Sequence, residues 1–68
     1  MTIACETMAA GNNANDVMDR AELIATSVDQ DWENEATLYT FSDDSVLLVT
    51  GPQCNAYETM TDAKSAME

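Results

Sequence analysis

The chain has 68 residues and carries 13 acidic side chains against two basic ones, for a formal net charge of −11. This charge argues against direct binding to nucleic acid or to an anionic membrane, because both are negative, and it favours a basic protein partner. Hydrophobic residues make up 46% of the sequence, which is typical of a folded protein, so we expect one small acidic domain spanning residues 1–68.

Residues 1–12 have no clear periodicity. The segment TIACET favours a short edge strand, and Gly11 with the two asparagines after it favours a turn. The N-terminal residues lack the basic and apolar regions of a signal peptide, and no apolar run is long enough to span a membrane, so we expect a cytoplasmic protein. In that compartment Cys5 and Cys54 are expected to be free thiols, with a disulfide between them as the alternative.

A helical period follows. Asn13 or Asn15 is a good N-cap, and the helix is predicted to end between Asp29 and Asn34. One face is apolar and comprises Val17, Met18, Ala21, Ile24, Ala25, Val28 and Trp32. The opposite face is acidic and comprises Asp16, Asp19, Glu22, Asp29 and Glu33. Leu23 lies near the acidic face, and we expect either an exposed apolar contact or a contact of the helix with another part of the protein on that side.

The remaining chain predicts strands. The segments ATLYTF and SVLLVTG are rich in β-branched and aromatic residues, and SDDS between them suits a hairpin loop. Gly51-Pro52 predicts a second turn before QCNAYE, a plausible third strand, and the apolar run Val46–Val49 suits a central strand. The tail is expected either to form one or two helical turns from Thr61 or to fray. The predicted fold is α+β, with one amphipathic helix on one face of a two- or three-stranded antiparallel meander, whose other face stays open as a candidate docking surface.

Catalytic and metal-binding motifs are missing from the sequence. There is no histidine, no phosphate-binding loop and no nucleophile–base pair, so we expect neither an enzyme nor a cofactor. Asp29, Asp31 and Glu33 match the start of a calcium-binding loop, but Asn34 and Thr40 stand where that loop requires Gly and Glu, so no metal site is predicted.

The acidic residues have two interpretations. Most charged helix faces are only solvated, but an ordinary exposed helix mixes both signs to form pairs, and this one carries only Arg20. Carboxylates spaced along a helix, with Asp43 and Asp44 at a hairpin tip, can take the place of DNA phosphates. Trp32, Tyr39, Phe41 and Tyr57 are expected mainly to pack in the core, with Trp32, Tyr39 or Tyr57 as the alternative anchors of an interface.

The acidic segment NDVMDRAELIATSVDQDWENE, the meander TLYTFSDDSVLLVTGPQCNAYE and the lack of catalytic residues resemble small acidic anti-CRISPR proteins encoded by phages. The resemblance is one of overall character and rests on no diagnostic motif. It implies a stoichiometric DNA mimic that occupies the positive DNA-binding site of a type I CRISPR surveillance complex (Cascade), at the large subunit that reads the PAM, in the host bacterial cytoplasm.

We therefore expect a non-enzymatic inhibitor that blocks target-DNA binding and acts as a monomer. Two alternatives are a halophile-adapted acidic domain and an adaptor or antitoxin-like protein for another basic partner. The expected contact residues are Asp29, Asp31, Glu33, Glu35, Asp43 and Asp44, with Asp16, Asp19 and Glu22 as a second stripe.

Overall fold

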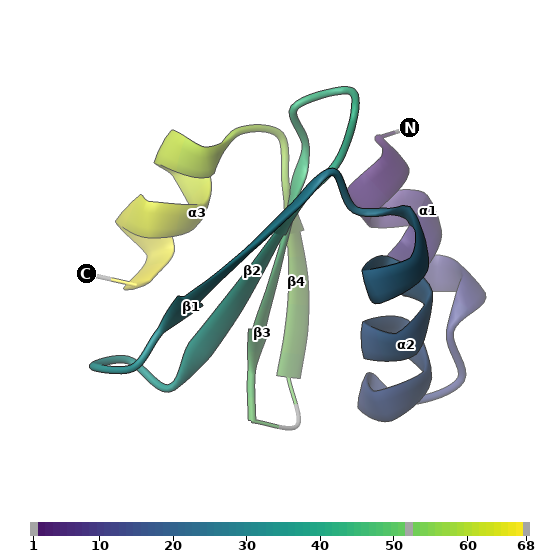
Figure 1. The fold of residues 1–68 in the computed structure, drawn as a ribbon, viewed down its shortest axis with the longest axis horizontal. Coiled ribbons are helices and arrows are strands. Elements are labelled where there is room, and N and C mark those ends of the chain that lie inside the picture. Colours follow the sequence, from purple (N-terminus) through teal and green to yellow (C-terminus); the bar gives the residue numbers. More distant parts are fainter. Residues whose placement is uncertain (1, 52, 68) are drawn as a thin grey trace.

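A four-stranded antiparallel sheet lies between helices in the computed structural model, which describes residues 2–51 and 53–67 (Figure 1). The strands follow chain order across the sheet, and each pairs with the next. The elements are α1 (Ile3–Ala10), α2 (Ala14–Ile24), β1 (Ser27–Asp31), β2 (Ala36–Thr40), β3 (Val46–Thr50), β4 (Gln53–Tyr57) and α3 (Met60–Met67). The predicted α+β class is confirmed, with four strands rather than two or three.

Both faces of the sheet are packed, because successive side chains of a strand point to opposite faces. Figure 1 shows α1 and α2 on one side of the sheet and α3 on the other. The α1–α2 side buries Ala4, Val17, Ala21, Tyr39, Phe41, Leu47 and Val49. The α3 side buries Ala36, Leu38, Val46, Leu48 and Ala63. The face that was expected to stay open is therefore partly covered by α3.

The prediction of an edge strand near the N-terminus is wrong, because residues 3–10 form α1. The Thr2 side chain caps this helix by accepting a hydrogen bond from the Cys5 amide at 3.2 Å. The segment is also rich in Ala, Met and Glu, which are strong helix formers. Its buried residues Ala4 and Thr7 lie on the face that packs against the sheet and α2.

The predicted long helix is also wrong at its C-terminal end. Asn13 caps α2 as expected, but the helix ends at Ile24 and the chain continues as strand β1. Thr26, Ser27 and Val28 have low helix propensity, and pairing with β2 gives this segment the backbone hydrogen bonds that a helix would otherwise supply. Val28 and Trp32, which were assigned to the buried helix face, are 49% and 81% exposed.

The C-terminal half agrees closely with expectation. The segment Val46–Val49 is buried throughout and lies in the interior strand β3. Gly51 occupies the turn before β4 with φ of +59°, a backbone conformation that favours glycine, whereas Pro52 lies outside the described residues. The tail forms α3 from Met60, one residue before the predicted start, and its buried Ala63 packs against the sheet.

Candidate functional site

A groove of about 630 Å³ lies on the α3 side of the sheet, between strand β1 and α3, which packs against β3 and β4. Its lining combines apolar and acidic side chains: Asp29, Gln30, Asp31, Trp32, Glu33, Asn34, Leu38, Met60, Lys64 and Met67. Leu38 is buried, and Met60 and Met67 pack against the same apolar cluster. The groove therefore has a largely apolar side on the sheet and α3, to which Lys64 adds one positive charge, and an acidic side on β1 and the turn after it.

The register of the sheet explains why carboxylates reach this groove. Asp29 pairs with Leu38 and Asp31 pairs with Ala36, so both acidic side chains project on the α3 side of the sheet. Asp29 is exposed and accepts no hydrogen bond among the described residues. This placement brings together Asp29, Asp31 and Glu33, although through a strand and a turn rather than through the predicted helix.

The β1–β2 turn is held by Asp31. Its carboxylate accepts hydrogen bonds from the Glu33 amide at 3.1 Å, the Asn34 amide at 3.3 Å and the Asn34 side chain at 2.9 Å. The bonds from Asn34, helped by the more distant charge of Lys64, lower the pKa of Asp31 below its ordinary value. Asp31 thus fixes the turn that presents Trp32 and Glu33 beside the groove, and Glu35 completes the turn with φ of +52°.

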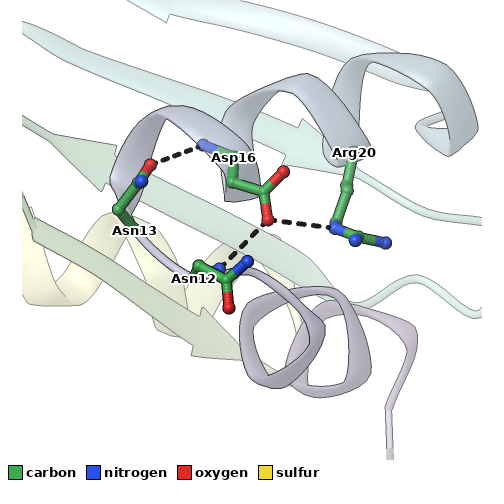
Figure 2. Close-up of polar contacts among 4 residues, drawn as sticks. All are labelled: Asn12, Asn13, Asp16 and Arg20. Atoms are coloured by element: carbon green, nitrogen blue, oxygen red, sulfur yellow. Dashed lines mark hydrogen bonds and ion pairs between the residues drawn. The ribbon is translucent and has the colours of Figure 1, made fainter.

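Asp16 is also engaged within the fold, at the start of α2 (Figure 2). Its carboxylate accepts hydrogen bonds from the Asn12 amide at 3.0 Å and from Arg20 Nε at 3.4 Å, while its own amide donates to the Asn13 side chain. The Asn12 amide first, and Arg20 second, lower the pKa of Asp16. Arg20–Asp16 is the single ion pair within the part of the chain that the structure describes. The cation on α2 is therefore already committed to one carboxylate.

Asp19 and Glu22 are the unengaged acids of α2, and both are exposed. Burial raises the pKa of Tyr39, and the charges of Glu22 and Asp19 raise it further. Tyr39 belongs to β2 and pairs across the sheet with Val28 of β1. The two acids therefore lie on α2, which packs against β3 and β4 on the side of the sheet opposite the groove.

Asp43 and Asp44 lie at the other end of the sheet from the β1–β2 turn. They occupy the β2–β3 loop, and a five-residue strand separates the two connections by roughly 14 Å or more. The Asp43 carboxylate accepts a hydrogen bond from the Ile3 amide at 2.9 Å and from the amide and hydroxyl of Ser45. These bonds, that of the Ser45 hydroxyl first, lower the pKa of Asp43. Asp43 therefore anchors α1 to the loop, and the structure does not bring it together with residues 29–35.

The nine predicted contact residues thus divide by role. Three carboxylates, those of Asp16, Asp31 and Asp43, are held by hydrogen bonds within the fold. The remaining six accept no hydrogen bond and pair with no cation among residues 2–51 and 53–67: Asp19, Glu22, Asp29, Glu33, Glu35 and Asp44. Sequence reasoning did not find the groove, because its α3 wall comes from the C-terminal tail and depends on tertiary packing.

The structure separates the four aromatic residues: the core interpretation is confirmed for Tyr39 and Phe41 and is wrong for Trp32. Tyr39 and Phe41 are core residues, each 1% exposed, and Tyr57 packs against the α3-side cluster. Trp32 is exposed and lines the acidic groove, and its role as an interface anchor stays a prediction. Leu23 is 85% exposed, in agreement with the first of the two alternatives for this residue.

Cys5 and Cys54 are free thiols, as predicted, and both are partly buried. Burial raises the pKa of Cys54. In the described ranges 2–51 and 53–67, no group of three or more Cys, Asp or Glu side chains is arranged to hold a metal ion. The described helices are all too short or too polar to cross a bilayer.

Comparison with known proteins adds no assignment: no protein-family model, no curated protein and no solved structure matches the chain.

Proposed function

We propose that the protein is a non-enzymatic inhibitor whose acidic surface occupies the positively charged DNA-binding site of a basic partner protein. The observation that carries this proposal is that six of the nine expected contact carboxylates have no hydrogen bond or ion pair among the described residues, in a chain with a net charge of −11. Unpaired like charges destabilise a compact domain, and a basic partner would convert that repulsion into attraction.

Three of the six carboxylates, those of Asp29, Glu33 and Glu35, follow one another along β1 and its turn. Within β1, Asp29 and Asp31 lie on one face and are about 6.8 Å apart along the strand, and the phosphates of one DNA strand advance by about the same distance over two nucleotides. This spacing supports phosphate mimicry along β1. Asp19 and Glu22 add exposed negative charge on α2, on the opposite side of the sheet.

The resemblance to anti-CRISPR proteins names a partner to test, the PAM-reading large subunit of a type I surveillance complex. Such a subunit holds duplex DNA through basic side chains, so an acidic domain of this size would meet complementary charge. In this proposal the protein binds the large subunit as a monomer, at the site that target DNA would otherwise occupy.

The test is a competition experiment. Purified type I surveillance complex is mixed with labelled target duplex, and the protein is titrated in at low and moderate salt. We expect DNA binding to be lost near one equivalent, and the protein's apparent affinity to fall as salt rises, because ionic contacts are screened. Undiminished DNA binding at both salt concentrations would contradict blockade of that complex. Pull-down experiments would then be used to find another basic partner. Measurements of the protein's folding stability at high salt would test the halophile alternative.

Matched variants locate the contact surface. The double variant Asp29→Asn/Glu33→Gln removes two unengaged charges at the groove, whereas Glu6→Gln/Glu58→Gln removes two exposed charges elsewhere. The variant Asp29→Asn/Glu33→Gln should lose clearly more inhibition of DNA binding than Glu6→Gln/Glu58→Gln. Equal weakening would mean that only total charge matters. Asp43 is unsuitable for this comparison, since its substitution also disturbs the contact with α1.

A further inference from the structure

Strand β1 is an edge strand whose outer side is open. Within residues 2–51 and 53–67 it pairs with β2 alone, and no helix packs extensively against it. Four of its five residues are exposed, and Asp31 is half-buried. In an antiparallel ladder, about half of the peptide groups of an edge strand point away from the sheet, so β1 presents unpaired N–H and C=O groups. Such an edge is a template for another extended chain.

The opposite edge differs. Both α1 and α3 pack against β4, and the contact between α1 and β4 is the most extensive between a helix and a strand among the described elements. The two edges are therefore unequal, and β1 is the more accessible of the two.

Charge argues against a second copy of this chain as the occupant of β1. If two β1 strands paired symmetrically about their centre, Asp29 would lie directly opposite Asp29 of the other copy. Like charges opposite each other in a sheet are destabilising, and two domains of net charge −11 repel one another at longer range. The edge is thus protected against self-association and suits a segment of opposite sign.

The two faces of β1 specify different side chains in an added strand. On the α3 side, Asp29 and Asp31 project next to the groove that Glu33 and Trp32 also line. Basic residues of an added strand would meet carboxylates there, and their alkyl chains would lie against Trp32 and the methionines of α3. On the other side Val28 is 49% exposed, and it would contact an apolar or β-branched residue.

We propose that β1 binds an extended basic segment of the partner protein by strand addition, with alternating basic and apolar residues. Backbone hydrogen bonds along the edge supply affinity, and the acidic groove selects the basic side chains. This inference rests on the proposed function only for the sign of the partner's charge. It does not require the partner to be a CRISPR complex.

The experiment uses three synthetic peptides of about seven alternating lysine and valine residues, with blocked ends. The first is unmodified. In each of the other two, alternate amide nitrogens along one of the two edges are methylated, which removes hydrogen-bond donors but keeps every charge. We expect the first peptide to bind at one equivalent, and the version methylated on the docking edge to bind at least tenfold more weakly. Hydrogen exchange should become slower at outward-facing amides of β1 when the first peptide binds.

Variants of the protein test the groove. Asp29→Asn/Glu33→Gln should weaken binding of the unmodified peptide by roughly two- to tenfold, because each exposed ion pair contributes modestly. The charge-matched variant Glu6→Gln/Glu58→Gln should weaken it less. Equal binding of the unmodified and both methylated peptides, protection confined to elements other than β1, or dimerisation of the free protein through β1 would overturn the proposal. Peptide binding without inhibition of the surveillance complex would keep strand addition and remove the CRISPR partner.

Discussion

The carboxylate of Asp43 joins two segments of the chain that lie 40 residues apart. It accepts a hydrogen bond from the Ile3 amide at the start of α1, while the adjacent Ser45 hydroxyl accepts one from the Ala4 amide at 3.1 Å. The amides of a helix's first turn lack partners within the helix, so the β2–β3 loop satisfies two of them. A residue that reads as surface charge in the sequence is thus part of the fold.

The first prediction concerns Ser45, which is fully buried. The variant Ser45→Ala leaves the buried Ala4 amide without its acceptor, so we expect a loss of roughly 1–3 kcal/mol in the free energy of unfolding. For a domain of this size each kcal/mol lowers Tm by roughly 4–8 °C. Thermal unfolding measures the change, and Ser42→Ala, an exposed position in the same loop, is the control. Similar losses in both variants would argue against the capping role.

The second prediction concerns pH. Hydrogen bonds from Ser45 and from the Ile3 amide hold the pKa of Asp43 below its ordinary value of 3.8. A carboxyl group with a lowered pKa contributes stability that is fully present above the unfolded pKa and is lost as pH falls through the folded pKa. Asp43→Asn should therefore lower Tm at neutral pH, and its difference from the unmodified protein should shrink once pH falls below about 3.8.

Asp44→Asn is the control for this experiment. The Asp44 carboxylate accepts no hydrogen bond from the described residues, and asparagine tolerates the φ of +69° at this position. The Tm difference between Asp44→Asn and the unmodified protein should not shrink at acidic pH in the way expected for Asp43→Asn. A Tm difference for Asp43→Asn that stays constant from neutral to acidic pH would contradict the role of the ionised carboxylate.

At the scale of elements, α1 and α2 are joined by a short connection that requires close packing. Gly11 lies against Val17, which is 4% exposed in the core. A Cβ atom at position 11 would overlap the Val17 side chain and lie 3.1 Å from the Val17 backbone nitrogen. The backbone at Gly11 has a negative φ, so space rather than conformation explains the need for glycine here.

The third prediction follows from this contact. Gly11→Ala should lower stability by roughly 1–3 kcal/mol, because overpacking forces the core to shift. The double variant Gly11→Ala/Val17→Ala should cost less than the sum of its two single changes, since the second substitution removes the overlapping methyl groups. Chemical denaturation of all four proteins measures this coupling. Strict additivity would show that the two positions do not interfere.

At the scale of the whole molecule, the protein combines a strongly negative surface with a small hydrophobic core. A domain of about this length buries only about 60% of the surface of its unfolded chain, so its stability is modest. Two basic residues offset 13 acidic ones, and one of the two, Arg20, already pairs with Asp16. Repulsion is therefore a substantial term opposing the folded state.

The fourth prediction is that salt stabilises the free protein. Raising sodium chloride from about 0.01 M to about 1 M shortens the screening length from roughly 30 Å to roughly 3 Å, so Tm should rise. The variant Asp29→Asn/Glu33→Gln should start from a higher Tm at low salt and gain less from added salt. A Tm that is independent of salt in both proteins would mean that repulsion among the acidic side chains destabilises the folded state very little.

The sequence by itself determined the α+β class, the strands from Ala36 onward, the interior place of β3 and the excess of negative charge. These follow from local signals, such as β-branched runs, turn residues and composition, that hold without knowledge of distant contacts. The segment from Thr26 to Trp32 was predicted incorrectly because the spacing of its apolar residues fits a helix. Its strand structure depends on pairing with β2, which the local sequence pattern does not reveal.

Only the tertiary structure decided the rest. It placed α3 against β3 and β4, so that a groove lined by acidic residues remains between α3 and the open edge strand β1. It also separated the acids that maintain the fold, such as Asp31 and Asp43, from those without a partner, such as Asp29 and Glu33. Each carboxylate has the same charge in the sequence, and its role depends on which amides the fold brings within hydrogen-bonding distance.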